Sequence, residues 1–289
     1  MSLLAGNDRV LKAACGSVAA ALAIILCGCA TQAQQADSVA ARAGMSRTVL
    51  EGSRFHHISY DRIVPGARLF IFVDGDGRPW VRGGREMAAD PTSRHPLLLD
   101  LAAQTRTGSV LYLGRPCYLG LARTPECQPS DWTSARYSTQ IVQSLAAAAN
   151  RFVSEHEIQE VFLIGHSGGG TLAVLMAPQV EHLRAVVTIA GNLDVSGWSA
   201  FHAYLPLAGS LDPAAGLQLP KGVTEIHLVG GADRNVPPQL MQRYLAAHPG
   251  ALVWTYPTFN HECCWREVWP AVLPRLMDAV APDRGGPES

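Results

Sequence analysis

One stretch of the sequence decides the fold that we expect: Glu160-Val-Phe-Leu-Ile-Gly-His-Ser-Gly-Gly-Gly170. Residues 159–164 are an apolar run that is typical of a buried strand, and the apolar pattern up to Met176 indicates a helix. Between the two lies Gly165-His-Ser-Gly-Gly169, which fits the pattern G-x-S-x-G. A strand, a sharp glycine turn and a helix in this order would lift the side chain of Ser167 above the end of the strand.

The rest of the chain repeats this alternation of strands and helices. Further strands are expected at residues 68–73, 109–113, 184–190, 226–229 and 252–256, and helices at 96–105, 135–155 and 266–280. Residues 48–60 are expected to add an antiparallel entry hairpin. The alternation predicts an α/β fold with a single domain at residues 47–282, in which helices cover both faces of a mostly parallel sheet. Ligands of such sheets bind beyond the carboxyl ends of the strands.

The composition limits the classes of protein to which the chain can belong. Hydrophobic residues make up 48% and charged residues 16% of the 289 residues, so the chain can bury a sizeable core and is not a disordered protein. The 23 Lys and Arg nearly balance the 24 Asp and Glu, and the net charge is -1. Nucleic acid is not expected as a partner, because no basic excess exists to neutralise its phosphates.

The first thirty residues carry the features of a bacterial export signal. Arg9 and Lys12 precede an apolar run at residues 13–26, which is shorter than the ~20 residues of a membrane span. The run ends in Leu26-Cys-Gly-Cys29, which resembles the lipobox of bacterial lipoproteins. This resemblance implies a signal peptide at residues 1–28, cleavage after it, and a lipid on Cys29. An ordinary signal peptide or an uncleaved anchor is the alternative.

The lipobox resemblance also implies where the protein resides. An exported lipoprotein faces the periplasm or the cell surface, and Ala30 after the cysteine favours the outer membrane. Residues 29–46 are polar and rich in Ala and Gln, so we expect a flexible tether between the membrane and the domain. Residues 283–289 are expected to form a disordered tail.

Four cysteines remain once the signal has left and Cys29 carries lipid. They are Cys117, Cys127, Cys263 and Cys264. An even number in an exported chain suggests disulfides, and the short loop between Cys117 and Cys127 makes this pair our first expectation. The other two would then form a vicinal bridge or stay free. A zinc site made of the four cysteines and His261 is the competing idea, but the spacings do not match the usual zinc motifs.

A serine hydroxyl becomes a good nucleophile only when a base takes its proton. His261 follows the last expected strand and Asp233 lies four residues after the strand at 226–229, so both fall at the same sheet edge as Ser167. The acid would orient the imidazole and stabilise its protonated form. Asp194, after the strand at 184–190, is the competing candidate for the acid. A phosphate-binding turn is the alternative for the glycines, but no Lys follows them as in a P-loop.

Such a catalytic set also needs donors for the oxyanion. The backbone N–H of Gly168 comes directly after the nucleophile, and the second donor is expected in the loop after an early strand. Asp74-Gly-Asp-Gly77 occupies that loop, and the N–H of Asp76 is the expected donor. A plain turn is the alternative. A calcium loop is disfavoured, because the remaining ligands of an EF-hand are missing.

Together, residues 48–280 resemble the α/β-hydrolase superfamily in the nucleophile turn, the acid loop and the histidine loop, and in their order along the chain. The loop at residues 74–77 resembles the HGxG segment of that superfamily, with Asp in place of His. The loop at residues 115–132 and the segment His261-Glu-Cys-Cys-Trp265 are similar to those of exported bacterial hydrolases of undefined substrate.

The resemblance implies a serine hydrolase that works through an acyl-enzyme, without a cofactor or a metal. Its substrate would be a small-molecule or lipid ester, and its membrane contact the lipid on Cys29. Two alternatives stay open: an acyltransferase that uses the same triad, and a non-catalytic lipoprotein that keeps the fold. The second is disfavoured, because a binding module need not retain Ser167, Asp233 and His261 together.

Overall fold

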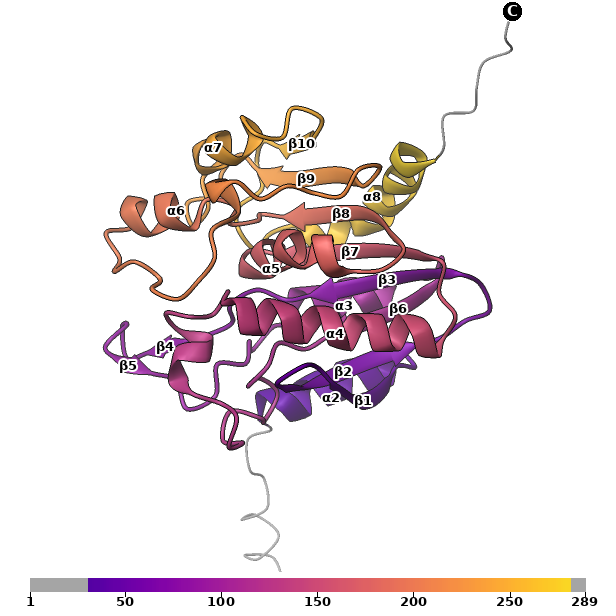
Figure 1. Ribbon diagram of the computed structural model, residues 1–289, viewed down its shortest axis with the longest axis horizontal. Helices are drawn as coiled ribbons and strands as arrows, with labels where there is room; N and C mark the ends of the chain where they lie inside the picture. The colour runs from indigo at the N-terminus through magenta and orange to yellow at the C-terminus, as the bar shows by residue number, and fades with distance from the viewer. Residues whose placement is uncertain (1–30, 282–289) are drawn as a thin grey trace, which may run out of the picture.

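A computed structural model of the chain describes residues 31–281, and one eight-stranded sheet dominates it (Figure 1). The strand order is β1-β2-β6-β3-β7-β8-β9-β10. The strands are β1 (Ser46–Glu51), β2 (His56–Arg62), β3 (Arg68–Val73), β6 (Ser109–Leu113), β7 (Glu160–His166), β8 (Leu183–Ile189), β9 (Thr224–Gly230) and β10 (Leu252–Tyr256). Strands β6, β3, β7, β8, β9 and β10 are parallel, whereas β1 and β2 are antiparallel to their neighbours. The predicted α/β fold and its entry hairpin are confirmed.

Helices cover both faces of the sheet, as Figure 1 shows. One face carries α4 (Thr139–Glu155) and α5 (Gly168–Met176), and the other carries α2 (Gln32–Arg42), α3 (Leu97–Gln104) and α8 (Trp265–Val280). Two shorter helices, α6 (Val195–Phe201) and α7 (Gln242–Leu245), follow β8 and β9. A small hairpin of β4 (Trp80–Val81) and β5 (Glu86–Met87) follows β3. Short 3-10 helices lie at Pro129–Trp132, Ala177–Gln179, Pro213–Ala215 and Pro238–Met241.

The central strands are buried because their side chains are apolar on both faces. Every residue of β6 is buried, and five of the six residues of β3 are buried. Strands of this kind need helices on both faces, and the crossover connections that contain these helices keep the strands parallel. The carboxyl ends of β3, β7, β8, β9 and β10 consequently meet at one edge of the sheet.

Helix α4 begins later than the sequence predicts, whereas helix α8 lies where it was expected. Helix α4 begins at Thr139 rather than residue 135, because the Ser138 side chain accepts a hydrogen bond from the amide of Ile141 and caps it there. Helix α8 continues through Pro270 and Pro274, although each proline removes a backbone donor. Its buried face, which includes Trp265 and Trp269, offsets that cost.

The expected tether at residues 29–46 is wrong for the part that the structure describes. Thr31 and Gln34 form a reciprocal capping box that begins α2, and the helix buries Ala36 and Ala40. The hydroxyl of Tyr60 on β2 also donates to Asp37 of this helix, at 2.7 Å. Small alanines four positions apart leave room for close packing, so a stretch that looks polar on average forms part of the domain.

Several expectations lie outside the described residues. These are the signal peptide at residues 1–28, the lipid on Cys29 and the tail at residues 283–289. Among residues 31–281, none of the helices has the length and apolar character that a membrane span requires.

Candidate active site

Ser167 stands on a sharp turn between β7 and α5. Its backbone has φ 53° and ψ -122°, a left-handed conformation that a side chain rarely adopts. The turn is tight enough that a Cβ atom on Gly165 would lie 2.1 Å from the carbonyl oxygen of Gly169. A Cβ atom on Gly169 would lie 2.1 Å from the carbonyl oxygen of Val73. The glycines of G-x-S-x-G are therefore required by contact with the neighbouring backbone.

Three side chains from three loops meet at this turn. The Nε2 atom of His261 lies 2.9 Å from the Oγ atom of Ser167, and its Nδ1 atom lies 2.8 Å from Oδ2 of Asp233. The Asp233 carboxylate can only accept, so Nδ1 of His261 carries the proton and Nε2 is free to accept the serine proton. The side chain of Asp233 is fully buried, whereas that of His261 is 16% exposed. The structure thus brings together the three residues expected from the sequence.

The acid loop holds Asp233 in place through its own backbone. The Oδ1 atom of Asp233 accepts hydrogen bonds from the amides of Asn235 and Val236, at 2.8 and 2.9 Å. This leaves Oδ2 directed at His261. The acid and histidine loops are joined as well, because the amide of Ala232 donates to the carbonyl of Phe259 at 2.9 Å.

Asp194, the competing candidate for the acid, has other partners. Its Oδ1 atom accepts from the amide of Gly197 at 2.8 Å and caps α6. The same oxygen pairs with Arg243 at 3.0 Å. The geometry therefore assigns Asp194 to the start of α6 and Asp233 to His261.

A second histidine supports the histidine loop. His166, directly before the nucleophile, donates from Nε2 to the carbonyl oxygen of His261 at 3.0 Å, and the indole of Trp265 donates to the same oxygen. Burial lowers the pKa of His166 to about 3, so its ring is neutral. The sequence analysis did not assign this role to His166.

The loop expected to supply the second oxyanion donor lies against the nucleophile. A Cβ atom on Gly75 would lie 3.3 Å from Cβ of Ser167, so this loop passes close to the serine. Within residues 31–281, the amides of Asp76 and Gly168 donate to no protein acceptor. The structure thus places Asp76 and Gly168 beside Ser167, where the sequence analysis expects the oxyanion donors.

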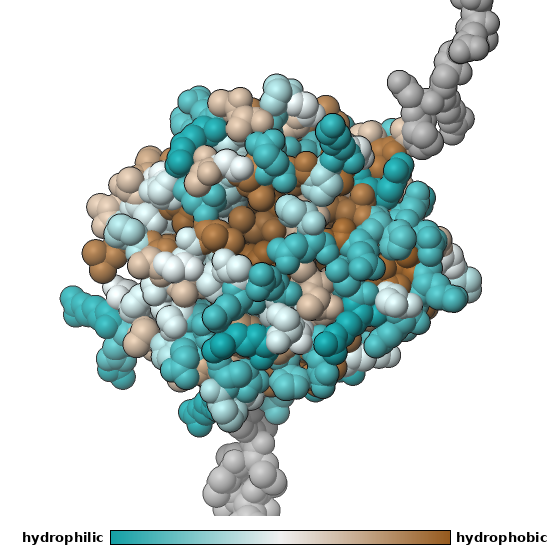
Figure 2. All heavy atoms as spheres, in the orientation of Figure 1, coloured by the Kyte–Doolittle hydropathy of each residue, from teal (hydrophilic) through white to brown (hydrophobic). Residues whose placement is uncertain are grey.

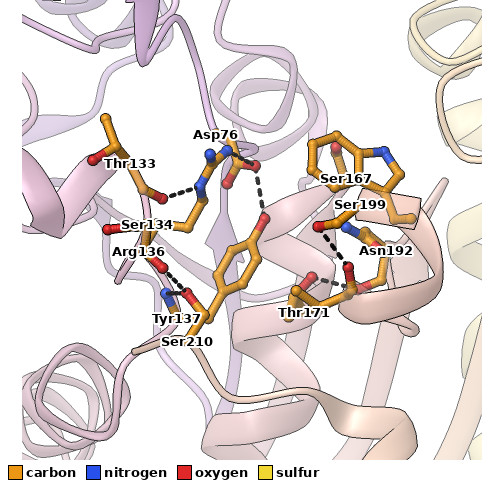
Figure 3. Close-up of polar contacts among 12 residues, drawn as sticks. Asp76, Thr133, Ser134, Arg136, Tyr137, Ser167, Thr171, Asn192, Ser199 and Ser210 are labelled. Atoms are coloured by element: carbon orange, nitrogen blue, oxygen red, sulfur yellow. Dashed lines mark hydrogen bonds and ion pairs between the residues drawn. The ribbon is translucent and has the colours of Figure 1, made fainter. Parts of the chain in front are cut away.

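The side chain of Asp76 lies in a buried cluster that the sequence did not reveal. Its carboxylate accepts from Arg115 at 2.6 Å, from Arg136 at 2.8 Å and from the hydroxyl of Tyr137 at 2.7 Å, and Figure 3 shows two of these side chains pointing to it. Burial would raise the pKa of Asp76, but the guanidinium groups of Arg136 and Arg115 outweigh this effect and hold it well below its usual range. The signal that the sequence offered was Arg115 in the loop at residues 115–132 and Arg136 shortly after it.

Asp74, at the start of the same loop, behaves differently. Its Oδ1 atom accepts from the amide of Gly75 at 2.9 Å, and the hydroxyl of Tyr112 lies 3.5 Å from Oδ2. Burial raises the pKa of this carboxyl to about 6. Asp74 therefore replaces the usual His of this loop with a group that is easily protonated.

The cysteines form two bridges. Cys117 and Cys127 are joined as expected, with an S–S distance of 2.06 Å, and Cys263 is joined to Cys264. The first bridge closes the loop that carries Tyr118. Within residues 31–281, no three His, Cys, Asp or Glu side chains lie close enough together to hold a metal ion.

Apolar side chains are exposed at the end of α6 and on the segment that follows it. They are Phe201, Tyr204, Leu205 and Leu211, of which Leu205 is 86% exposed. Figure 2 shows apolar residues at the surface near α5 and α6, whereas polar residues cover α4. This segment follows β8, so it lies at the sheet edge that carries Ser167.

Solved structures with the same fold belong to the α/β-hydrolase superfamily. A membrane phospholipase A, described as a bacterial virulence factor, aligns over 95% of this chain and 100% of its own, with 14% identity and a TM-score of 0.61. The Pyrococcus furiosus esterase Pf2001 aligns over 83% of this chain and 93% of its own, with 12% identity and a TM-score of 0.58. A Mycobacterium tuberculosis puromycin-hydrolyzing peptidase matches with 16% identity and a TM-score of 0.61 over 83% of this chain.

These likenesses establish the fold. The chain spans about 40% of the length of the two puromycin hydrolases that it matches. The sequence matches no protein-family model and no curated protein. The chain therefore has the α/β-hydrolase fold that its sequence predicted.

Proposed function

We propose that this protein is a serine hydrolase that cleaves carboxylic esters through an acyl-enzyme. The observation that carries this proposal is the continuous hydrogen-bonded line from Asp233 through His261 to Ser167, with distances of 2.8 and 2.9 Å. This line lies at the carboxyl edge of a parallel sheet, where such folds bind their ligands.

The geometry supports the following sequence of steps. Nε2 of His261 takes the proton from Ser167 as Oγ attacks the ester carbonyl, and Asp233 stabilises the imidazolium that forms. The amides of Gly168 and Asp76 donate to the oxyanion of the tetrahedral intermediate. The imidazolium then protonates the departing alcohol, which leaves the acyl group on Ser167. Water activated by His261 releases the acid and restores the serine.

A lipid ester is the substrate class that we favour. The exposed apolar side chains of residues 201–211 lie at the edge of the sheet that carries Ser167, and they offer a surface for an acyl chain. The alignment with a membrane phospholipase A over nearly the whole chain also supports a lipid ester as the substrate. We further propose that a lipid on Cys29 anchors the protein to the outer membrane of a bacterium, as the lipobox-like sequence suggests.

Covalent labelling is the test of the proposed function. A fluorophosphonate probe should label the wild-type protein, and peptide mapping should place the adduct on Ser167, while Ser167→Ala should not react. p-Nitrophenyl esters of increasing chain length, with matched anilides, then define the bond and the acyl group. An unlabelled, folded wild type would refute the hydrolase, and preferential anilide cleavage would make the protein an amidase.

A further inference from the structure

The Asp76 cluster ties the proposed oxyanion loop to a different part of the chain. Arg115 and Arg136 bind the two carboxylate oxygens of Asp76 from positions 39 and 60 residues further along. The hydroxyl of Tyr118 donates to the backbone carbonyl of Asp76 at 2.9 Å, so the backbone of the loop is held as well as its side chain. The residue expected to supply an oxyanion donor is therefore held from four sides.

The cluster also lies against the first turn of α5. A Cβ atom on Gly168 would lie 2.1 Å from Oδ1 of Asp76 and 2.4 Å from the hydroxyl of Tyr137. Gly168 provides the other expected oxyanion donor. One buried cluster thus touches both residues whose amides are expected to donate to the oxyanion.

The charges of the cluster do not cancel. Two guanidinium groups face the Asp76 carboxylate, so these three side chains carry one positive charge, which the nearby Asp74 carboxylate offsets when it ionises above its pKa of about 6. The side chains of Arg115 and Arg136 are 2% and 5% exposed, so water screens this charge poorly. A lone Asp76 carboxylate would repel a developing oxyanion, whereas the guanidinium groups of Arg115 and Arg136 offset this repulsion.

We propose that Arg115 and Arg136 are positioning residues of the oxyanion hole, which act by holding Asp76 in place and by offsetting the negative charge of its carboxylate. This inference rests on the proposed serine hydrolase. A cluster with a purely structural role would also join the loops, because Arg136 donates to the carbonyl of Thr133 and Arg115 to that of Arg136. If the arginines position the oxyanion hole, variants of Arg115 and Arg136 lose affinity for an oxyanion. If their role is purely structural, folded variants keep that affinity.

The first test compares Arg136→Met and Arg115→Met with Arg68→Met. Arg68 pairs with Glu160 at the other end of the sheet, so its variant loses an ion pair away from the site. We expect kcat for p-nitrophenyl acetate to fall about 100-fold in the cluster variants, while KM changes less than about threefold and the control keeps its rate. Affinity for a trifluoromethyl ketone, whose serine adduct carries an oxyanion, should fall in proportion to kcat/KM. Arg136→Lys should recover part of both losses, because it restores the charge.

Milder variants keep the inference testable when an arginine variant does not fold. Tyr137→Phe and Tyr118→Phe each remove one hydroxyl from the cluster, and each should lower kcat by about tenfold at unchanged KM. Folded cluster variants whose kcat and inhibitor affinity stay within about twofold of the wild type would overturn the inference. A wild type that neither reacts with the fluorophosphonate nor turns over esters would instead refute the proposed function.

Discussion

Oδ2 of Asp233 lies 2.8 Å from Nδ1 of His261, and the other oxygen of the same carboxylate accepts from two backbone amides. Both carboxylate oxygens are thus committed before any substrate arrives. The imidazole is held in the one tautomer that leaves Nε2 free to take the proton of Ser167. A side chain of the same shape but without the negative charge, such as asparagine, could therefore not replace Asp233.

Asp233→Asn is therefore expected to lower kcat for ester hydrolysis on the order of 10⁴-fold, because the amide favours the wrong imidazole tautomer. Asp194→Asn is the matched control, since this carboxylate caps α6 and pairs with Arg243. It should lower stability by less than about 1 kcal/mol and leave kcat nearly unchanged, because asparagine still caps α6 and only the partly exposed ion pair with Arg243 is lost. Kinetics on both folded variants decide the matter: loss of turnover in Asp194→Asn alone would show that the acid is misassigned.

Gly169→Ala tests the tight turn below the nucleophile. A methyl group there would lie 2.1 Å from the carbonyl oxygen of Val73, so strand β3 or helix α5 must move. We expect a loss of stability of about 1–3 kcal/mol, although alanine favours a helix over glycine by about 1 kcal/mol. Gly250→Ala is the control, because a Cβ atom there has open space around it. Urea unfolding that ranks the two variants equally would contradict the close contact.

The Cys117–Cys127 bridge should stabilise the loop that holds the oxyanion residues. The two cysteines are 10 residues apart, and closing so short a loop is worth about 2–3 kcal/mol. Replacement of both by Ser should lower the free energy of unfolding by that amount. It should also lower kcat, because Arg115 and Tyr118 lie on the same loop. Peptide mapping without reduction checks the pairing, and a link from Cys117 to Cys263 would contradict it.

Asp74 should make stability depend on pH. Burial raises the pKa of its carboxyl from 3.8 to about 6, so the folded protein favours the protonated form. Its contribution to stability is complete below pH 3.8 and is lost as the pH rises through about 6. The free energy of unfolding of Asp74→Asn, relative to that of the wild type, should therefore rise by on the order of 3 kcal/mol between pH 3.5 and 7. Urea unfolding at several pH values measures this difference, and a constant difference would contradict the burial of the charge.

Cys29→Ser tests the anchor. A clickable fatty acid should label the wild-type protein in a bacterial host, and it should not label the variant, since the lipobox reaction needs the thiol of Cys29. Cys27→Ser is the matched control, because it removes the neighbouring thiol while the lipobox-like sequence puts the lipid on Cys29. Equal labelling of wild type and Cys29→Ser would remove the lipoprotein from the proposal.

The sequence predicted the features that local patterns determine. Strands such as β3 and β7 are apolar runs, and Ser167, Asp233 and His261 each lie shortly after a strand that was expected from its sequence. The choice between Asp233 and Asp194 needed the structure, because both carboxylates follow parallel strands at the same edge. Only the partners of each, His261 and Arg243, separate them.

Features that depend on distant partners could not be predicted. Asp76 meets Arg136 across 60 positions of sequence, and no local pattern marks such a pair. Helix α2 was missed because its alanines become a buried face only when α3 lies beside them. A polar average composition hides a narrow apolar stripe of this kind.

Helix α2 has a mechanical consequence for an anchored protein. Its cap is Thr31, so only Ala30 separates Cys29 from the folded domain, and two residues span about 7 Å at most. With a lipid on Cys29, the domain would be held directly at the bilayer surface, in contrast to a domain on a long flexible linker. Its search for substrate would then be confined to the surface of the leaflet that holds the lipid.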